Sequence, residues 1–247
     1  MHSNPNVNSG SPATPVRIAI LAKAPLAGFA KTRLAPALGA RGAARLQRAF
    51  ILRTVRVARQ ASLGGGVQLW CALSADQRFF RALQRTTDVD CSDQPAGDLG
   101  QRMQAAIAAT PGPVLLVGTD CPALTVQHLR TAAAALQGGT GTGTGTGAKA
   151  VFIPAEDGGY VLVGLQQPQP GLFHGIDWST ERVMAQTRQR AGALGVALHE
   201  LAPLWDVDTP DDLARLATLP EFAPLLAPQT PARCHPSLLS PEPACPC

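Results

Sequence analysis

The stretch that most constrains the fold of this chain is Val114-Leu-Leu-Val-Gly-Thr-Asp-Cys-Pro122. Its run of apolar residues predicts a strand over Val114–Gly118 that is covered on both faces, as strands of parallel sheets are. Asp120 then falls at the carboxyl end of that strand, the edge at which open α/β sheets bind their ligands. Asp120 is therefore a candidate ligand for a divalent cation that holds a diphosphate. The alternative is that it only caps the helix expected over 125–136.

Apolar segments that alternate with helical ones predict an α/β fold for the 247 residues. Hydrophobic residues make up 45% of the chain, enough for a large core, and no apolar run approaches the length of a membrane span. Further strands are expected over 16–22, 67–73, 149–154 and 196–201, and helices over 40–60 and 181–191. We therefore expect one α/β domain over residues 16–222 that does not cross a membrane.

Three segments are expected to lie outside the packed part of this domain. Residues 1–15 are polar and lack a secretory pattern, so they are predicted to be a disordered leader. Residues 138–147 repeat Gly and Thr, which is typical of a flexible loop, and 223–247 are Pro-rich and predicted to be disordered. The six cysteines match no zinc pattern, and a chain of this size needs no disulfides, which favours a cytoplasmic location.

Charge is distributed unevenly along the chain. Residues 1–75 contain ten Lys or Arg and no acidic residue, whereas the remainder contains eleven basic and seventeen acidic residues. This asymmetry predicts an anion site in the first part and a cation site in the second. A nucleic-acid surface is the competing interpretation, but the sequence has no aromatic residues interleaved with the basic ones and no known binding motif. We therefore expect no nucleic-acid partner.

The loop after the first strand, residues 23–34, is the second strong signal. Gly28 allows the backbone to turn or to approach a ligand, and Lys23, Lys31 and Arg33 add three cations. Such a loop suits a phosphate group through backbone N–H donors and charge-assisted hydrogen bonds. It has neither Walker nor dinucleotide-binding spacing. The alternative is a basic loop that is merely solvated.

Several residues of the second part are candidates for both structural and functional roles. Asp98 either caps the helix that follows it or contacts a ligand, and Arg102, one turn further, either reaches the site or lies in solvent. Asp157 is a candidate base for an acceptor hydroxyl, or part of an Asp-Gly turn. Trp178 either walls an acceptor pocket or packs in the core.

Asp206 and Asp208 are not explained by the helix cap expected around Thr209 and Pro210. Alternation places both carboxylates on the same side of an extended segment. Together with Asp120 they are predicted to complete a metal site.

The order of these motifs resembles a known family. Lys-x-Pro-x-x-Gly-x-x-Lys-Thr-Arg-Leu, Gly-Asp-Leu-Gly-x-Arg-Met, Gly-Thr-Asp-Cys-Pro, Asp-Gly-Gly-Tyr, Trp-Ser-Thr and Asp-Val-Asp-Thr-Pro-x-Asp-Leu follow one another between Val16 and Leu219. This pattern resembles the bacterial DUF2064 family, described as glycosyltransferase-A-like (GT-A) transferases and often linked to arsenosugar biosynthesis. The resemblance implies the nucleotide-diphospho-sugar transferase fold, a three-layer α/β/α sandwich with a mostly parallel mixed sheet.

The resemblance also implies roles for individual residues. Lys23, Gly28, Lys31 and Arg33 would face a nucleotide, with Asp98 and Arg102 as further candidates for nucleotide binding. Asp120 stands where such enzymes keep a metal-binding aspartate. The chain has a single acid there rather than Asp-x-Asp, so Asp208 or Asp206 would complete the Mg²⁺ or Mn²⁺ site.

We therefore expect a metal-dependent transferase that moves a glycosyl group from a nucleoside-diphosphate sugar to a small-molecule acceptor. The cation and the basic loop would stabilise charge on the leaving diphosphate. Asp157 would orient or deprotonate the acceptor, and Tyr160 and Trp178 would shape its pocket. Two alternatives stay open at this point: a nucleotidyltransferase that joins a nucleoside triphosphate to a phosphorylated acid, and a non-catalytic nucleotide-binding protein.

Overall fold

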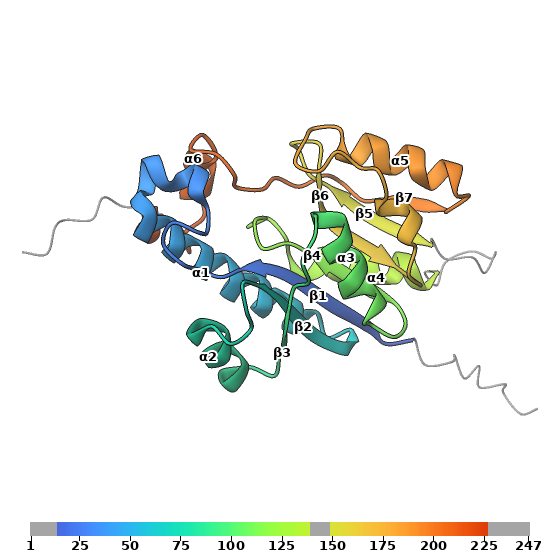
Figure 1. The fold of residues 1–247 in the computed structure, drawn as a ribbon, viewed down its shortest axis with the longest axis horizontal. Helices are drawn as coiled ribbons and strands as arrows, with labels where there is room; N and C mark the ends of the chain where they lie inside the picture. The colour runs from blue at the N-terminus through green and yellow to red at the C-terminus, as the bar shows by residue number, and fades with distance from the viewer. Residues whose placement is uncertain (1–13, 139–148, 227–247) are drawn as a thin grey trace, which may run out of the picture.

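The computed structural model describes residues 14–138 and 149–226, drawn in colour in Figure 1. Most of the predicted leader, the Gly-Thr segment beyond Gly138 and the chain beyond residue 226 lie outside the described residues. Within the described ranges, seven strands form one sheet in the order β3-β2-β1-β4-β6-β5-β7. The strands are β1 (Val16–Lys23), β2 (Gly64–Ala72), β3 (Asp90–Asp93), β4 (Val114–Val117), β5 (Ala150–Pro154), β6 (Tyr160–Leu165) and β7 (Leu198–Glu200).

The sheet is mixed but mostly parallel. β1 pairs in parallel with β2 and with β4, β2 with β3, and β5 with β7, whereas β6 runs antiparallel to both β4 and β5. Ile20 of β1 lies opposite Val117 of β4, and Val117 lies opposite Leu162 of β6. This register brings the carboxyl ends of β1 and β4 and the amino end of β6 to one edge of the sheet, which we call the carboxyl edge.

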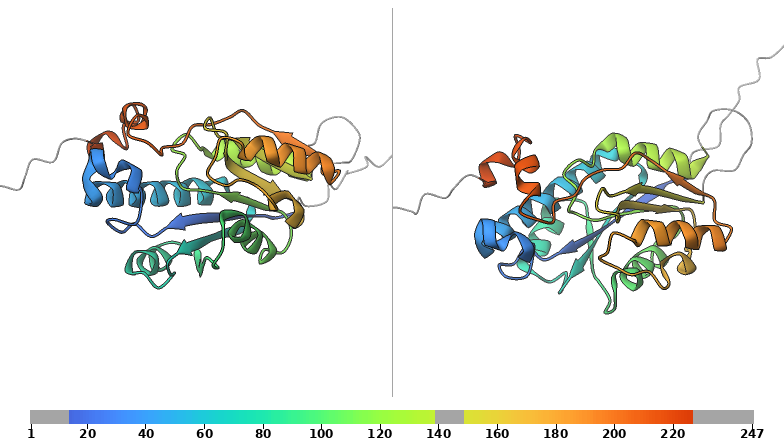
Figure 2. Two further views of the ribbon diagram at one scale, coloured as in Figure 1. Left: turned by 45° about the horizontal axis from the view of Figure 1, so that its top comes forward. Right: turned by 90° about the horizontal axis from the view of Figure 1, so that it is seen from above.

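Helices cover both faces of the sheet (Figure 2, right), so the predicted three-layer α/β/α architecture is confirmed. α1 and α4 pack on one face, and α3 and α5 pack on the other. The helices are α1 (Ala35–Ala61), α2 (Arg78–Thr86), α3 (Leu99–Ala108), α4 (Val126–Gln137), α5 (Val183–Ala193), α6 (Asp212–Ala217) and α7 (Ala223–Leu226), with 3₁₀ turns η1 (Thr32–Leu34) and η2 (Pro170–Phe173). None of these helices is long and apolar enough to cross a membrane.

The central strand β4 is buried on both faces, as its sequence predicts. Leu115 and Val117 belong to the core beneath α1 and α4, whereas Val114 and Leu116 belong to the core beneath α3 and α5. All four side chains are at most 3% exposed. A strand with two apolar faces is stable only between two layers of helices, and this placement fixes where Asp120 emerges.

A third, smaller core lies at the carboxyl edge and involves the last described segment of the chain. Val207, Leu216 and Phe222 pack against Leu46 and Phe50 of α1. The segment between β7 and α6 therefore crosses the molecule and reaches the amino-terminal half of α1 (Figures 1 and 2). The helix α7 lies within the range expected to be a disordered tail, and its Leu225 and Leu226 pack against this core.

Candidate active site

Lys31 is turned into the protein rather than toward solvent. Its backbone adopts a left-handed conformation, with φ 49° and ψ 44°, immediately before η1. The side chain is only 6% exposed, and Nζ lies 3.0 Å from Asp120 Oδ1 and 3.2 Å from Asp208 Oδ1. Nζ also donates a hydrogen bond to the carbonyl oxygen of Val207 at 2.5 Å. The first basic loop and the two predicted metal-binding segments thus meet at one point.

Two opposing effects act on the pKa of Lys31. Burial by itself lowers that pKa, but the carboxylates of Asp120 and Asp208 outweigh the burial and raise it above its usual value. The ammonium is therefore charged throughout the physiological pH range. The ammonium also lies over the ring of Phe50, whose centroid is 5.5 Å from Nζ.

Backbone and side-chain hydrogen bonds hold the loop after β4 in place. The carbonyl oxygen of Asp120 accepts a hydrogen bond from the amide of Val207 at 2.9 Å, which ties the late segment to this loop. From α1, Gln47 Nε2 donates a hydrogen bond to the hydroxyl of Thr119 at 3.1 Å. Gln47 is 2% exposed, so a buried amide of α1 orients the loop that carries Asp120. We did not single out Gln47 from the sequence, although a glutamine among apolar positions of a helix could have indicated it.

Three carboxylates form a cluster that could hold a metal ion. Asp157, Asp206 and Asp208 each offer an oxygen, and these oxygens lie within 4.8 Å of one another. Val207, between the two late aspartates, is fully buried, so Asp206 and Asp208 do share one side of the segment as alternation predicts. Asp120 is outside this set, and its Oδ1 lies 3.0 Å from Lys31 Nζ. The structure thus places Asp157, rather than Asp120, in the acidic triad.

The triad concentrates negative charge around Asp206. Burial, followed by the charges of Asp157, Asp208 and Asp120, raises the pKa of Asp206 to about 7. A divalent cation would relieve this repulsion, and oxygen donors of this kind are what Mg²⁺ and Mn²⁺ prefer. The residues present therefore fit the ion that the fold implies.

Asp157 is held in a tight turn between β5 and β6. Its Oδ1 accepts a hydrogen bond from the amide of Gly159 at 2.9 Å, the Asp-Gly turn that the sequence allowed. Gly158 has φ +93°, and a Cβ there would lie 2.1 Å from the carbonyl oxygen of Glu181. Its own carbonyl accepts from the amide of Met184 at 2.8 Å. Only glycine fits this contact, so the turn is fixed against the start of α5.

Tyr160 and Trp178 form an aromatic wall next to this turn. Their ring centroids lie 6.5 Å apart in an edge-to-face arrangement. The Tyr160 hydroxyl lies 3.9 Å from Met103 Sδ, and burial raises the pKa of Tyr160. A Cβ at Gly100 would lie 2.6 Å from the Trp178 ring, so α3 approaches this wall closely. The arrangement suits a shaping role for both rings, which stays a prediction.

The remaining candidates come from the first loop and from the start of α3. Asp98 caps α3, where its carboxylate accepts from the amide of Gln101 at 2.8 Å, while Arg102 Nε is buried without a hydrogen-bond partner among the described residues. Lys23 is exposed at the end of β1. Arg33, whose side chain is 67% exposed, lies 3.7 Å from Asp208. The nucleotide-binding roles predicted for these residues stay predictions.

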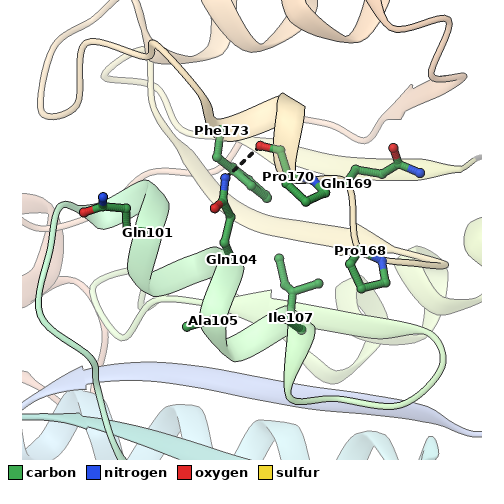
Figure 3. Close-up of a pocket in the computed structure, with 9 residues that line it drawn as sticks. Gln101, Gln104, Ala105, Ile107, Pro168, Gln169, Pro170 and Phe173 are labelled. Atoms are coloured by element: carbon green, nitrogen blue, oxygen red, sulfur yellow. Dashed lines mark hydrogen bonds between the residues drawn. The ribbon is translucent and has the colours of Figure 1, made fainter.

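A separate hollow of about 340 Å³ lies between α3 and the segment that ends in η2 (Figure 3). Gln104 crosses it and donates to the carbonyl oxygen of Pro170 at 2.7 Å. Its lining is mostly apolar and includes Ile107, Pro168 and Phe173. None of the predicted site residues lines it, so the charged site at the carboxyl edge is where we expect the chemistry.

The fold is that of nucleotide-diphospho-sugar transferases. A protein from Desulfovibrio desulfuricans G20, described provisionally as a transferase of this class, is 26% identical with a TM-score of 0.70, over 84% of this chain and 89% of that one. A CMP:2-keto-3-deoxy-manno-octonic acid synthetase solved with CTP is 11% identical with a TM-score of 0.54, over 83% of this chain and 98% of that one. A cytidylyltransferase from Leptospira borgpetersenii is 14% identical with a TM-score of 0.53, over 86% and 92% of the two chains.

This chain belongs to the bacterial family described as "Uncharacterized protein conserved in bacteria (DUF2064)". The family profile matches residues 54–180, just over half of the chain. The match includes Asp120 and Asp157 but neither Lys31 nor Asp206 and Asp208. No curated protein matches the chain in sequence.

Proposed function

We propose that this protein is a metal-dependent glycosyltransferase that moves a sugar from a nucleoside-diphosphate donor to a small-molecule acceptor. The observation that carries this proposal is the meeting of Lys31 with four aspartates at the carboxyl edge of the sheet. In α/β sheets this edge is where ligands bind. The transferase fold and the 26% identical neighbour support the same class of reaction.

Asp206 and Asp208 are the residues that we propose as the principal ligands of Mg²⁺ or Mn²⁺. Both are half-buried and share one side of the late segment. Asp157 is the exposed member of the triad and would close the site on its solvent side. When bound, the ion would neutralise charge that develops on the leaving diphosphate.

The exposed cations of the first loop would bind the diphosphate. Lys23 and Arg33 are exposed and can reach a ligand without breaking a buried contact. The loop around Gly28 is also exposed, which leaves its backbone accessible to phosphate oxygens.

On the acceptor side, we propose that Asp157 accepts a hydrogen bond from the acceptor hydroxyl and orients or deprotonates it. One of its oxygens is already bonded to the amide of Gly159, which fixes the carboxylate. Tyr160 and Trp178 would exclude water from this side of the site through their packed rings. Their contribution is positioning and shape.

The test is hydrolysis of the donor, in which water takes the glycosyl group in place of the acceptor. A panel of nucleoside-diphosphate sugars is incubated with Mn²⁺, Mg²⁺ or EDTA and scored by release of the nucleoside diphosphate. Wild-type protein should release it only with a divalent cation, and Asp206→Asn and Asp208→Asn should lose at least about a hundredfold in rate. Glu200→Gln is the matched control, because the exposed Glu200 pairs with Arg188 of α5 and does not belong to the carboxylate cluster. Full activity of Asp206→Asn and Asp208→Asn would refute the assignment of the ion site.

The same assay separates the two alternatives. A nucleotidyltransferase would release pyrophosphate from a nucleoside triphosphate in the presence of a phosphorylated acid, and would leave sugar nucleotides intact. A non-catalytic nucleotide-binding protein would be stabilised by nucleotides in thermal denaturation, without turnover of any donor.

A further inference from the structure

We infer that Lys31 is an internal counter-ion of the acidic cluster, and that a divalent cation must compete with its ammonium for Asp208. This inference rests on the proposed function, because it concerns the ion site assigned there. It changes the role expected for Lys31 from that of an open phosphate-binding side chain to that of a cation already bound within the site.

The ammonium of Lys31 has no free hydrogen-bonding capacity. An ammonium has three donors, and Nζ faces three oxygens: the carbonyl of Val207 at 2.5 Å, Asp120 Oδ1 at 3.0 Å and Asp208 Oδ1 at 3.2 Å. The Phe50 ring lies on one side of it, and the side chain is 6% exposed. A phosphate oxygen can therefore reach Nζ only if one of these contacts is released.

Asp208 is the carboxylate that the ammonium and a metal ion would share. It contacts Lys31 through Oδ1, and it also contributes an oxygen to the triad with Asp157 and Asp206. Because the Lys31 ammonium is already paired with this carboxylate, Asp208 attracts a second cation less strongly. Lys31 and the ion are thus coupled through Asp208, and each disfavours the other.

The backbone supports this function of Lys31. A lysine in the left-handed region is uncommon and persists only where its surroundings hold it there. Here the conformation directs the side chain inward, onto two acidic segments that are far from it in sequence. The contact with the Val207 carbonyl also ties this lysine to the late segment.

Mn²⁺ binding in the absence of nucleotide tests the competition directly. Mn²⁺ is titrated into wild-type protein, Lys31→Met and Arg188→Met, and electron paramagnetic resonance measures the Mn²⁺ that stays free. Methionine keeps most of the apolar stem but removes the charge. Lys31→Met should bind Mn²⁺ about tenfold more tightly than the wild type, or better. Arg188→Met, which removes the same charge from a surface pair with Glu200, should bind like the wild type.

A second measurement uses the wild-type protein and needs no folded variant. Acylation of lysine side chains is followed by mass spectrometry with and without saturating Mn²⁺. The exposed Lys23 should react equally in both conditions. Lys31 should be protected without the ion and react several times faster with it, because the ion displaces it from Asp208.

The inference is overturned if Lys31→Met binds Mn²⁺ no more tightly than the wild type, or if Mn²⁺ leaves the reactivity of Lys31 unchanged. These outcomes are distinct from failure of the proposed function. Equal Mn²⁺ affinities with a transfer activity that depends on Asp206 would refute the competition and keep the proposed function. Tighter Mn²⁺ binding by Lys31→Met, together with no transfer from any sugar nucleotide by the wild type, would support the competition and refute the proposed function.

Discussion

Asp206 should make the metal-free protein less stable as the pH rises, and its replacement by asparagine should remove that effect. In the folded protein its pKa is raised to about 7, from 3.8 in the unfolded chain, by burial and by the neighbouring aspartates. Between about pH 4 and pH 7 the folded protein therefore retains a proton that the unfolded chain has released. Stability then falls as the pH rises through this window and levels off above about pH 7.

The size of the effect follows from the shift. One pKa unit corresponds to about 1.4 kcal/mol, so the full shift limits the loss of folding free energy from Asp206 to about 4 kcal/mol. Asp206 is only half-buried, and solvent screens part of this repulsion. We therefore expect Asp206→Asn to be more stable than the wild type by about 1–2 kcal/mol at pH 8, and by much less at pH 4.5.

Urea denaturation in the presence of EDTA, followed by circular dichroism at several pH values, measures this difference. The gap between variant and wild type should open as the pH increases from 4.5 to 7 and then stay constant. In Mn²⁺ the order should reverse, because the ion stabilises only the protein with an intact carboxylate cluster. A variant that is no more stable than the wild type at pH 8, or a gap that does not change with pH, would refute the proposed charge repulsion.

Three further changes test other parts of the site. Gly158→Ala should destabilise the protein by about 2 kcal/mol or more in thermal denaturation, because Gly158 has a φ of +93° and an added Cβ would collide with Glu181. Gly192→Ala in α5 is the control and should be neutral or stabilising, because a Cβ added there would meet no neighbouring residue within 4 Å. Asp212→Asn should lose about 1 kcal/mol at pH 7, with solvent screening allowed for, and progressively less as the pH falls below about 4. Burial alone would raise the pKa of Asp212, yet the hydrogen bonds that it accepts from Thr209 and Asp208 lower that pKa. Unchanged urea stability at pH 7 would contradict this. Arg33→Ala should weaken nucleotide binding in calorimetry with little change in Tm, since the side chain is 67% exposed; equal affinity would remove Arg33 from the diphosphate site.

Features of the site that depend only on residues close together in the sequence could be predicted from the sequence. The apolar run of β4 implies burial on both faces, and its end therefore places Asp120 at the carboxyl edge. Alternation around Val207 places Asp206 and Asp208 together. The cap at Asp98 and the turn at Asp157 are each one of two roles that the sequence allows. The three-layer fold was implied by the resemblance of the ordered motifs to a known family.

The partners of the charged groups were decided by the tertiary structure. Nothing near Lys31 in the sequence indicates that its ammonium is buried between Asp120 and Asp208, or that Asp157 joins the triad instead of Asp120. Periodicity reports which face of an element is buried, and that is a local property of the chain. Which carboxylates share a cation depends on the insertion of β6 beside β4 and on the late segment that packs against α1, and only the folded chain brings those segments together.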